Sequence, residues 1–249
     1  MPAYDILAGQ YDLLMDNVDY DAWAAYIKRI LDRYGRQGGV KTVLEAACGT
    51  GQMTVRLSRF GYGVIALDIS EAMLDRAGEV LRAAGVSAPL IRQDMRDISL
   101  HKKVDAVVCC CDGVNYLTGL DDVKKFFESA HELLEPGGLL TFDISSRDKL
   151  SSMDGALFSE DRPSVTYLWN NAWDEEKKTL TMDLIFFERR KDGLYTRGDE
   201  RHVQRGHSAE EIKDLLEETG FDLVGVWRHL TEESPQKGVQ RLQLAAVKR

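Results

Sequence analysis

The amino-acid sequence predicts an α/β protein with a doubly wound, mostly parallel sheet of seven strands and a small antiparallel β insertion. Between about residues 40 and 145, apolar strand-like runs alternate with helix-like segments, a pattern typical of parallel sheets with right-handed crossovers. The first apolar run ends in a glycine-punctuated turn, Gly49-Thr-Gly51. After Asp143 the pattern changes to strands joined by polar turns, and the last two strands should complete the sheet, the final one antiparallel.

Two helix-like pieces precede the alternating region. In the first, apolar and aromatic residues recur at roughly helical spacing from Tyr4 to Met15. The second should begin near Asp19 to Asp21 and has a clearer period, which includes Trp23. Glycines between Gly35 and Gly39 should end this section.

The alternating region should contain five strands and three helices. Ser70 is expected to cap the second of these helices, and Gly85 to end it. We expect strands near residues 42–47, 63–68, 88–92, 104–111 and 138–144, and helices near residues 51–60, 71–84 and 121–134.

The rest of the chain should hold the insertion and then return to the sheet. Ser208 to Glu211 form a capping box that should start a helix, and Gly220 should stop it. The expected insertion strands are 165–169, 180–187 and 195–203, and the expected last two strands of the main sheet, paired as an edge hairpin, are 221–228 and 239–247.

The first two strands carry the signs of a nucleotide site. Glycines such as Gly49 let the backbone approach a ligand without a Cβ in the way. Asp68 ends the second strand, where a carboxylate offers paired acceptors to a ribose diol. A dinucleotide fingerprint would place a third glycine or alanine where this chain has Thr54. Glu45, inside the first strand, would repel a pyrophosphate but suit a cationic ligand.

This pattern resembles the class I, Rossmann-like S-adenosylmethionine (SAM) methyltransferases, whose first motif pairs an acidic residue with a Gly-x-Gly turn. Four further segments follow in the family's order, and with the first they cover about residues 40–145. The layout is similar to small-molecule N- or O-methyltransferases and to uncharacterised bacterial members that open with a Tyr-Asp…Tyr-Asp-x-Trp stretch. The further segments are Ile69–Met73, Gln93–Met95, Val104–Asp112 and Leu133–Asp143, and the opening stretch is here Tyr11-Asp12 and Tyr20-Asp-Ala-Trp23.

The resemblance implies SAM as cofactor, S-adenosylhomocysteine (SAH) as product, and a set of contacts. Asp68 would accept the ribose hydroxyls, Glu45 would orient the ammonium, and Asp94 would accept from the adenine amino group. Plainer explanations stay open, such as a helix-dipole role for Asp68 and an Asx-turn for Asp94. The expected cofactor-binding residues are Tyr11, Glu45, Ala47, Gly49, Gly51, Asp68, Ile69, Met73, Asp94, Met95, Cys111, Asp112 and Tyr116.

Catalytic residues are not assigned by the resemblance, because SAM carries its own leaving group and alignment supplies most of the acceleration. Two residues are nevertheless candidates. The Tyr11 hydroxyl would contact the methionine end of SAM or the methyl acceptor. His202, near the return of the insertion to the core, could deprotonate an amine or hydroxyl acceptor, although a histidine there could equally be inert.

The four cysteines do not have the spacing of a zinc site, and we expect no metal. They are best explained as small buried apolar residues in a reducing compartment. Cys48 and Cys111 nevertheless lie at strand carboxyl ends, where ligands bind in such sheets. Bound SAM should therefore slow the alkylation of at least one of them.

The net charge of −9 argues against broad binding of nucleic acid. The resemblance implies a small-molecule methyl acceptor as the partner. Neither a membrane-spanning run nor a signal peptide is recognisable, so a cytoplasmic location is expected. A protein or RNA methyltransferase, a catalytically silent SAM binder and a nucleotide oxidoreductase remain alternatives. The basic cluster at Arg189 to Lys191 is too small to indicate an RNA groove. The chain could be a monomer or a homodimer.

The chain should divide into three parts. Residues 1–146 would form an N-terminal cap and the SAM-binding core, and residues 147–206 the antiparallel insertion. Residues 207–249 would complete the core. Since no linker separates the insertion from the core, we expect it to act as a lid over the site.

Overall fold

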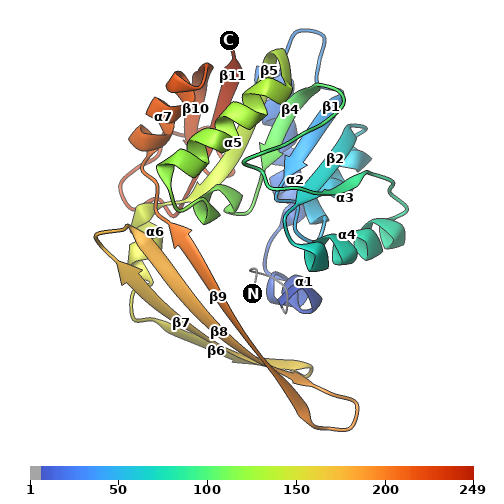
Figure 1. The fold of residues 1–249 in the computed structure, drawn as a ribbon, viewed down its shortest axis with the longest axis vertical. Helices are drawn as coiled ribbons and strands as arrows, with labels where there is room; N and C mark the ends of the chain where they lie inside the picture. Colours follow the sequence, from blue (N-terminus) through green and yellow to red (C-terminus); the bar gives the residue numbers. More distant parts are fainter. Residues whose placement is uncertain (1–6) are drawn as a thin grey trace.

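A computed structural model describes residues 7–249, so the start of the first expected helical piece, from Tyr4 to Ile6, lies outside the described residues. The main sheet has seven strands in the order β10-β11-β5-β4-β1-β2-β3 (Figure 1). Its pairings are parallel except for the two that β11 makes, with β5 and with β10. The predicted fold class is confirmed. The strands are β1 Thr42–Ala46, β2 Gly63–Asp68, β3 Leu90–Arg92, β4 Val104–Cys109, β5 Leu134–Ser145, β10 Phe221–Arg228 and β11 Arg241–Lys248.

Helices cover both faces of this sheet because its strands are apolar on both sides. Side chains of α2 and α3 pack on one face, and those of α5 and α7 on the other. The expected caps are present: the Ser70 hydroxyl accepts from the Met73 amide, and Gly85 ends α4 in the left-handed conformation. The helices are α2 Tyr20–Tyr34, α3 Gln52–Arg59, α4 Glu71–Ala84, α5 Leu120–Leu133 and α7 Ala209–Glu218.

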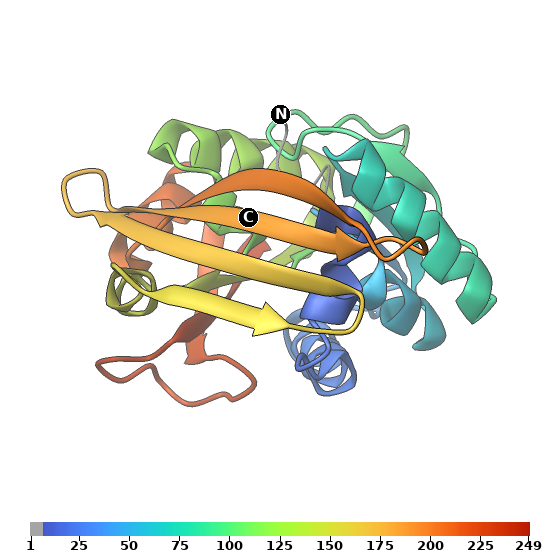
Figure 2. The same cartoon turned by 90° about the horizontal axis from the view of Figure 1, so that it is seen from below.

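The insertion forms a separate antiparallel sheet in the order β6-β7-β8-β9 (Figure 2). Three of its strands were expected, but β6 and the preceding short helix α6 were not. All residues of β6 are exposed, so this edge strand carries no alternating apolar pattern. The helix has fewer than two turns and starts at the Ser146 cap. The bounds are α6 Arg147–Ser152, β6 Leu157–Asp161, β7 Val165–Asp174, β8 Thr179–Arg189 and β9 Tyr195–Arg205.

The last two strands pair antiparallel at the sheet edge as predicted, but the later one, β11, is the inner strand. It inserts between β5 and β10, and no local sequence pattern indicates that order. Among the described helices, none is long and apolar enough to cross a membrane.

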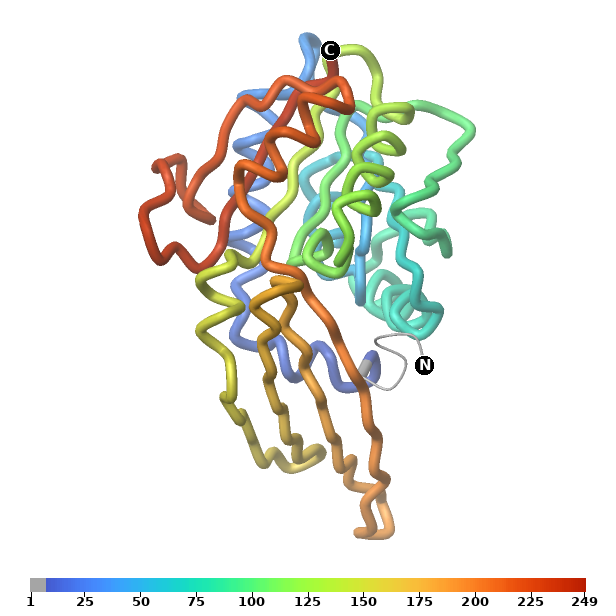
Figure 3. The backbone as a smooth tube through the Cα atoms, turned by 60° about the vertical axis from the view of Figure 1, so that its left-hand side comes forward, coloured from blue at the N-terminus to red at the C-terminus, as the bar shows by residue number. Residues whose placement is uncertain are grey.

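The N-terminal segment lies between the carboxyl edge of the main sheet and the insertion (Figure 3). From residue 7 on, it contains a short 3₁₀ turn, Leu7–Gly9, and one helical turn, α1, Tyr11–Leu14. The Arg162 guanidinium of the insertion donates to the Leu13 carbonyl and to the Asp16 carboxylate. Asp12 accepts from the Thr50 hydroxyl in the glycine turn, at 2.6 Å. The segment thus bridges the two sheets.

Candidate active site

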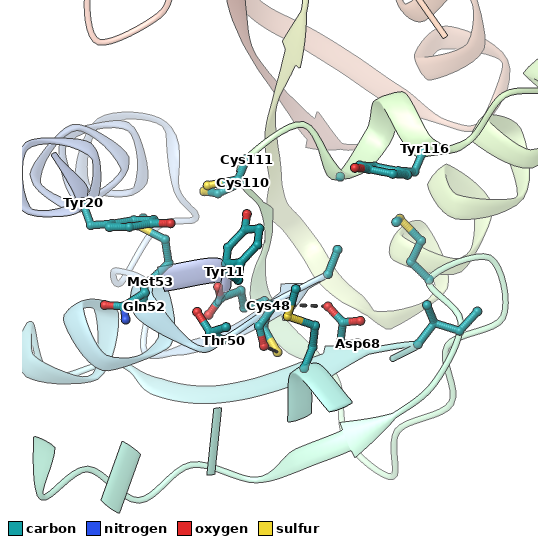
Figure 4. A pocket seen from close by; sticks show the side chains of 17 residues that line it. Tyr11, Tyr20, Cys48, Thr50, Gln52, Met53, Asp68, Cys110, Cys111 and Tyr116 are labelled. Atoms are coloured by element: carbon teal, nitrogen blue, oxygen red, sulfur yellow. Dashed lines mark hydrogen bonds between the residues drawn. The ribbon is translucent and has the colours of Figure 1, made fainter. Parts of the chain in front are cut away.

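A cavity lies where the carboxyl ends of β1, β2 and β4 meet (Figure 4). The turn after β1, the residues that follow β2 and the short 3₁₀ helix η2 (Gly113–Tyr116) after β4 form its walls. Tyr11 of α1 lies across it from the opposite side. Its position agrees with the general placement of ligands in open parallel sheets. We call it the first cavity.

Asp68 ties two walls of the first cavity together. One carboxylate oxygen accepts from the Gly49 amide and the other from the Ser70 amide, both at 2.9 Å. Burial raises the pKa of Asp68, and these amide bonds oppose that rise. Because a carboxylate has about four lone-pair sites, Asp68 can hold the turn and still accept from a ligand.

Glu45 is buried at the base of the first cavity and accepts from the Thr54 hydroxyl at 2.5 Å. Burial raises its pKa to about 8, while the Thr54 bond acts in the opposite direction. The carboxyl is therefore mostly protonated at neutral pH until a positive charge arrives. This bond also gives a structural reason for Thr54 at the position where a dinucleotide fingerprint has glycine.

Three non-glycine residues at the site have left-handed backbone angles. They are Ala47 after β1, with φ of 54°, and Cys111 and Asp112 after β4, with φ of 61° and 64°. Each such residue stores strain that the surroundings must compensate, and such strain gathers at functional sites. The Asp143 carboxylate holds Cys111 and Asp112 in place, because it accepts from the Cys111 amide at 2.8 Å and from the Asp112 amide at 3.1 Å.

A second cavity adjoins the first and extends between the core, α6 and the insertion. Tyr11, Cys111 and Tyr116 line both cavities, so they form the boundary between them. The walls of the second cavity are largely aromatic and aliphatic. Its apolar side chains come from Leu14, Met15, Val18, Trp23, Leu150, Met153, Tyr167, Trp169, Met182 and Leu184.

One part of the second cavity is strongly polar. The Arg241 guanidinium donates to both Asp112 and Asp143 and lies 5.1 Å from the Trp23 ring centroid. Burial would raise the pKa of Asp112, but the positive charges of Arg241 and Lys149 hold it below its usual range. Burial raises the pKa of Asp143 to about 6 against the effect of Arg241.

His202 lines the second cavity and is buried, not exposed on the surface. One ring nitrogen lies 3.0 Å from a Glu200 oxygen and the other 3.3 Å from the Tyr116 hydroxyl. His207, close in sequence, is instead bonded to the Leu117 carbonyl, and burial lowers its pKa to about 4. Of the two, only His202 reaches the cavities.

Three of the thirteen predicted cofactor-binding residues do not line the first cavity. Gly51 approaches α4, where a Cβ would lie 2.8 Å from a Leu81 methyl carbon. Asp94 pairs with Arg96, and Asp112 lines the second cavity. The ten that do line the first cavity are Tyr11, Glu45, Ala47, Gly49, Asp68, Ile69, Met73, Met95, Cys111 and Tyr116.

Several lining residues were not predicted. Tyr20, Gln52 and Met53 are examples in the first cavity, and Lys149 and Arg241 in the second. The Tyr-Asp-x-Trp stretch contains Tyr20 and was the one sequence signal for any of them. The others reach the cavities through tertiary contacts that leave no local pattern.

The chain is similar to known methyltransferases in sequence and in structure. A family model described as a methyltransferase domain matches residues 43–138. A candidate methyltransferase of Geobacillus sp. (strain WCH70) is 34% identical over 98% of this chain and 99% of its own. The crystal structure of a SAM-dependent methyltransferase from Clostridium acetobutylicum ATCC 824 superposes with a TM-score of 0.87, at 29% identity over 98% of both chains.

A third relative has a defined substrate. The dTDP-3-amino-3,4,6-trideoxy-alpha-D-glucopyranose N,N-dimethyltransferase of Streptomyces venezuelae is 33% identical over 138 residues. The match covers 55% of this chain and 56% of that protein.

Proposed function

Because this chain belongs to the class I SAM-dependent methyltransferases, we propose that it methylates an N or O atom of a small molecule held in the second cavity. The observation that carries this proposal is the pair of adjoining cavities, which meet at Tyr11, Cys111 and Tyr116. A cofactor in one cavity and an acceptor in the other would face each other across that boundary.

The first cavity suits SAM by its chemistry. Among the described residues that line it there is no lysine or arginine, whereas Asp68 and Glu45 are both present. Two acidic groups with no basic residue beside them disfavour a pyrophosphate, and a ligand ammonium would draw Glu45 into its ionised form. Asp68 would hold the ribose diol and Glu45 the ammonium. Ile69, Met73 and Met95 would contact the adenine.

When bound, SAM supplies an activated methyl group and a neutral thioether leaving group. The protein's contribution is then to orient the acceptor and to exclude water. Tyr11 and Tyr116 are placed to do this, since they line both cavities. Burial raises the pKa of Tyr11 well above its usual value, so its hydroxyl keeps its proton and can donate to an acceptor atom.

The second cavity suits a small acceptor because its walls are largely apolar with a few polar groups, as in small-molecule pockets. Aromatic rings such as Trp23 and Trp169, beside carboxylates such as Asp112, would attract an amine-bearing molecule. Similarity to an amino-sugar N,N-dimethyltransferase points in the same direction.

The test is a transfer assay with SAM that carries a trideuterated methyl group and a panel of amines, amino sugars and hydroxylated compounds. We expect mass spectrometry to find the label in at least one small molecule, and Trp169→Ala to reduce its incorporation. Label found in added tRNA or protein, and in none of the small molecules, would contradict the proposal.

Glu45 should couple cofactor binding to proton release. A ligand ammonium would lower the pKa of this carboxyl from about 8, so SAH binding at pH 7 should release about one proton. SAH affinity should accordingly rise between pH 6 and pH 8. Calorimetry in buffers of different ionisation enthalpy measures the release. Glu45→Gln replaces a carboxyl that is already neutral and should abolish it, and an unchanged release in this variant would contradict the assignment.

Bound cofactor should protect the cysteines of the first cavity. Cys48 and Cys111 line it, and burial raises the pKa of both thiols, so alkylation should be slow even without ligand. At SAH concentrations about ten times Kd, labelling of at least one should slow about tenfold. Cys109 is buried and does not line the cavity. Its labelling, measured in the same proteolytic digest of the alkylated protein, reports global opening of the fold. Equal rates at Cys48 and Cys111 with and without SAH would refute this protection.

A further inference from the structure

Two side chains of β9 and one of η2 form a line that ends at the boundary between the two cavities. Glu200 and His202 lie on β9, and Tyr116 ends η2. A Glu200 oxygen is 3.0 Å from Nε2 of His202, and Nδ1 of the same ring is 3.3 Å from the Tyr116 hydroxyl. The side chains of Glu200 and His202 are each only 3% exposed. Such a buried line of a carboxylate, an imidazole and a phenol is an arrangement able to carry a proton.

The relay requires one direction for each of the two bonds. An ionised Glu200 accepts from Nε2 of His202, which then carries the ring proton. Nδ1 in turn accepts from the Tyr116 hydroxyl. The phenol oxygen keeps lone pairs of its own, and Tyr116 lines both cavities. Its hydroxyl can therefore accept a proton from a molecule in the second cavity while giving its own to His202.

We propose that Tyr116, His202 and Glu200 form a relay that takes the proton from the methyl acceptor, and this proposal rests on the function proposed above. Tyr116 is the catalytic residue that touches the acceptor. His202 stores the proton, and Glu200 is a positioning residue that fixes the tautomer and stabilises the imidazolium. The arrangement favours an acceptor that reaches the site with a proton to lose, such as a protonated amine or a hydroxyl.

The proton and electron balance is complete without a further reactant. The acceptor's N–H or O–H bond breaks, its proton passes to the Tyr116 oxygen, and the tyrosine proton passes to Nδ1 of His202. The acceptor atom keeps the electron pair and uses it to bond the methyl carbon, and the carbon–sulfur pair leaves with the sulfur. The imidazolium later returns its proton to water.

Other titratable groups surround the relay and could influence a pH profile. They come from α1, from the segment after β4, and from α6, β7 and β11, all packed around the same cavity. These groups are Tyr11, Asp112, Lys149, Tyr167 and Arg241. The charges of Asp112 and Arg241 are paired with each other, and the Lys149 ammonium donates to the Ser145 hydroxyl at 2.9 Å. Because these groups could also shape a kinetic pH profile, the test includes a direct measurement of the His202 tautomer.

The first arm of the test needs no acceptor. Nitrogen-15 NMR of labelled histidine in the SAH complex should show His202 protonated at Nε2 and not at Nδ1. Tyr116→Phe should shift the Nδ1 resonance, because this nitrogen loses its donor, and leave Nε2 unchanged. A proton on Nδ1, or a Nδ1 resonance that ignores Tyr116→Phe, would overturn the relay.

The second arm uses any amine or alcohol that the wild-type enzyme methylates. His202→Gln and Tyr116→Phe should each lower kcat/KM by about 10²–10⁴ and remove the acid limb of its pH profile. His202→Gln should bind SAH normally, since His202 does not line the first cavity. Gln204→Ala, on the same strand and cavity wall, should keep the acid limb.

The outcomes separate the relay from the proposed function. If His202→Gln retains the acid limb and changes kcat/KM less than threefold, the relay is wrong although methyl transfer stands. If the wild type methylates no compound, the proposed function fails, and the NMR arm alone decides whether the relay exists.

Discussion

Replacement of Asp68 by alanine should weaken SAH binding by about 100-fold or more. The variant loses the ribose acceptor, and each charge-assisted hydrogen bond contributes about 1.5–3 kcal/mol. It also leaves the Gly49 and Ser70 amides without the acceptor that now joins them. The glycine turn should then lose its fixed place beside β2. Titration calorimetry with SAH measures the loss.

Two further variants make the Asp68 result specific. Asp68→Asn keeps one oxygen acceptor and should bind SAH with intermediate affinity. Asp75→Ala removes an exposed carboxylate from the neighbouring helix α4 and should leave affinity unchanged. If Asp68→Ala binds SAH within threefold of wild type, Asp68 does not hold the cofactor and the placement of SAM in the first cavity is wrong.

Replacement of Arg241 by methionine should destabilise the fold by about 3–5 kcal/mol at pH 7.5. Its guanidinium lies between two carboxylates, Asp112 and Asp143, and Asp143 is fully buried. Removal of one partner leaves uncompensated buried charge, which is among the costliest single changes. Denaturant unfolding measures the difference. Arg33→Met breaks an exposed ion pair with Glu232 and should cost no more than about 1 kcal/mol.

The loss of unfolding free energy in Arg241→Met should become smaller as the pH falls. Without the guanidinium, the folded-state pKa of Asp143 should rise further above its unfolded value, because only its amide hydrogen bonds still oppose burial. The pKa of Asp112 should rise as well, although Lys149 continues to oppose burial there. The folded variant then binds more protons than the unfolded chain, so its unfolding free energy increases toward acid. In the wild type, the pKa of Asp143 is already raised to about 6, so part of this trend is present before mutation. A deficit equally large at pH 5.5 and pH 7.5 would contradict this account.

The parallel core was predictable because its signals are local. Each strand is a short apolar run between turns, and the glycine turn and Asp68 mark strand ends directly in the sequence. The carboxyl ends of parallel strands must meet at one sheet edge, so the residues that follow them could be expected together. Ten of the predicted residues accordingly line one cavity.

The contacts around the second cavity could not be predicted in the same way. Tyr116 and His202 are 86 residues apart, and Asp112 and Arg241 are 129 apart. These pairs form because the insertion returns beside η2 and because β11 enters between β5 and β10. Their chemistry depends on strand order, which hydrophobic periodicity does not encode. Asp112, Tyr116 and His202 were each candidates, but without their partners.

A crystal structure of the protein with SAH tests the central claim most directly. The account predicts SAH in the first cavity, its ribose hydroxyls bonded to Asp68 and its sulfur at the boundary of Tyr11, Cys111 and Tyr116. The second cavity should stay open beyond the sulfur. SAH found in the second cavity, or bound with its sulfur turned away from that boundary, would contradict the account.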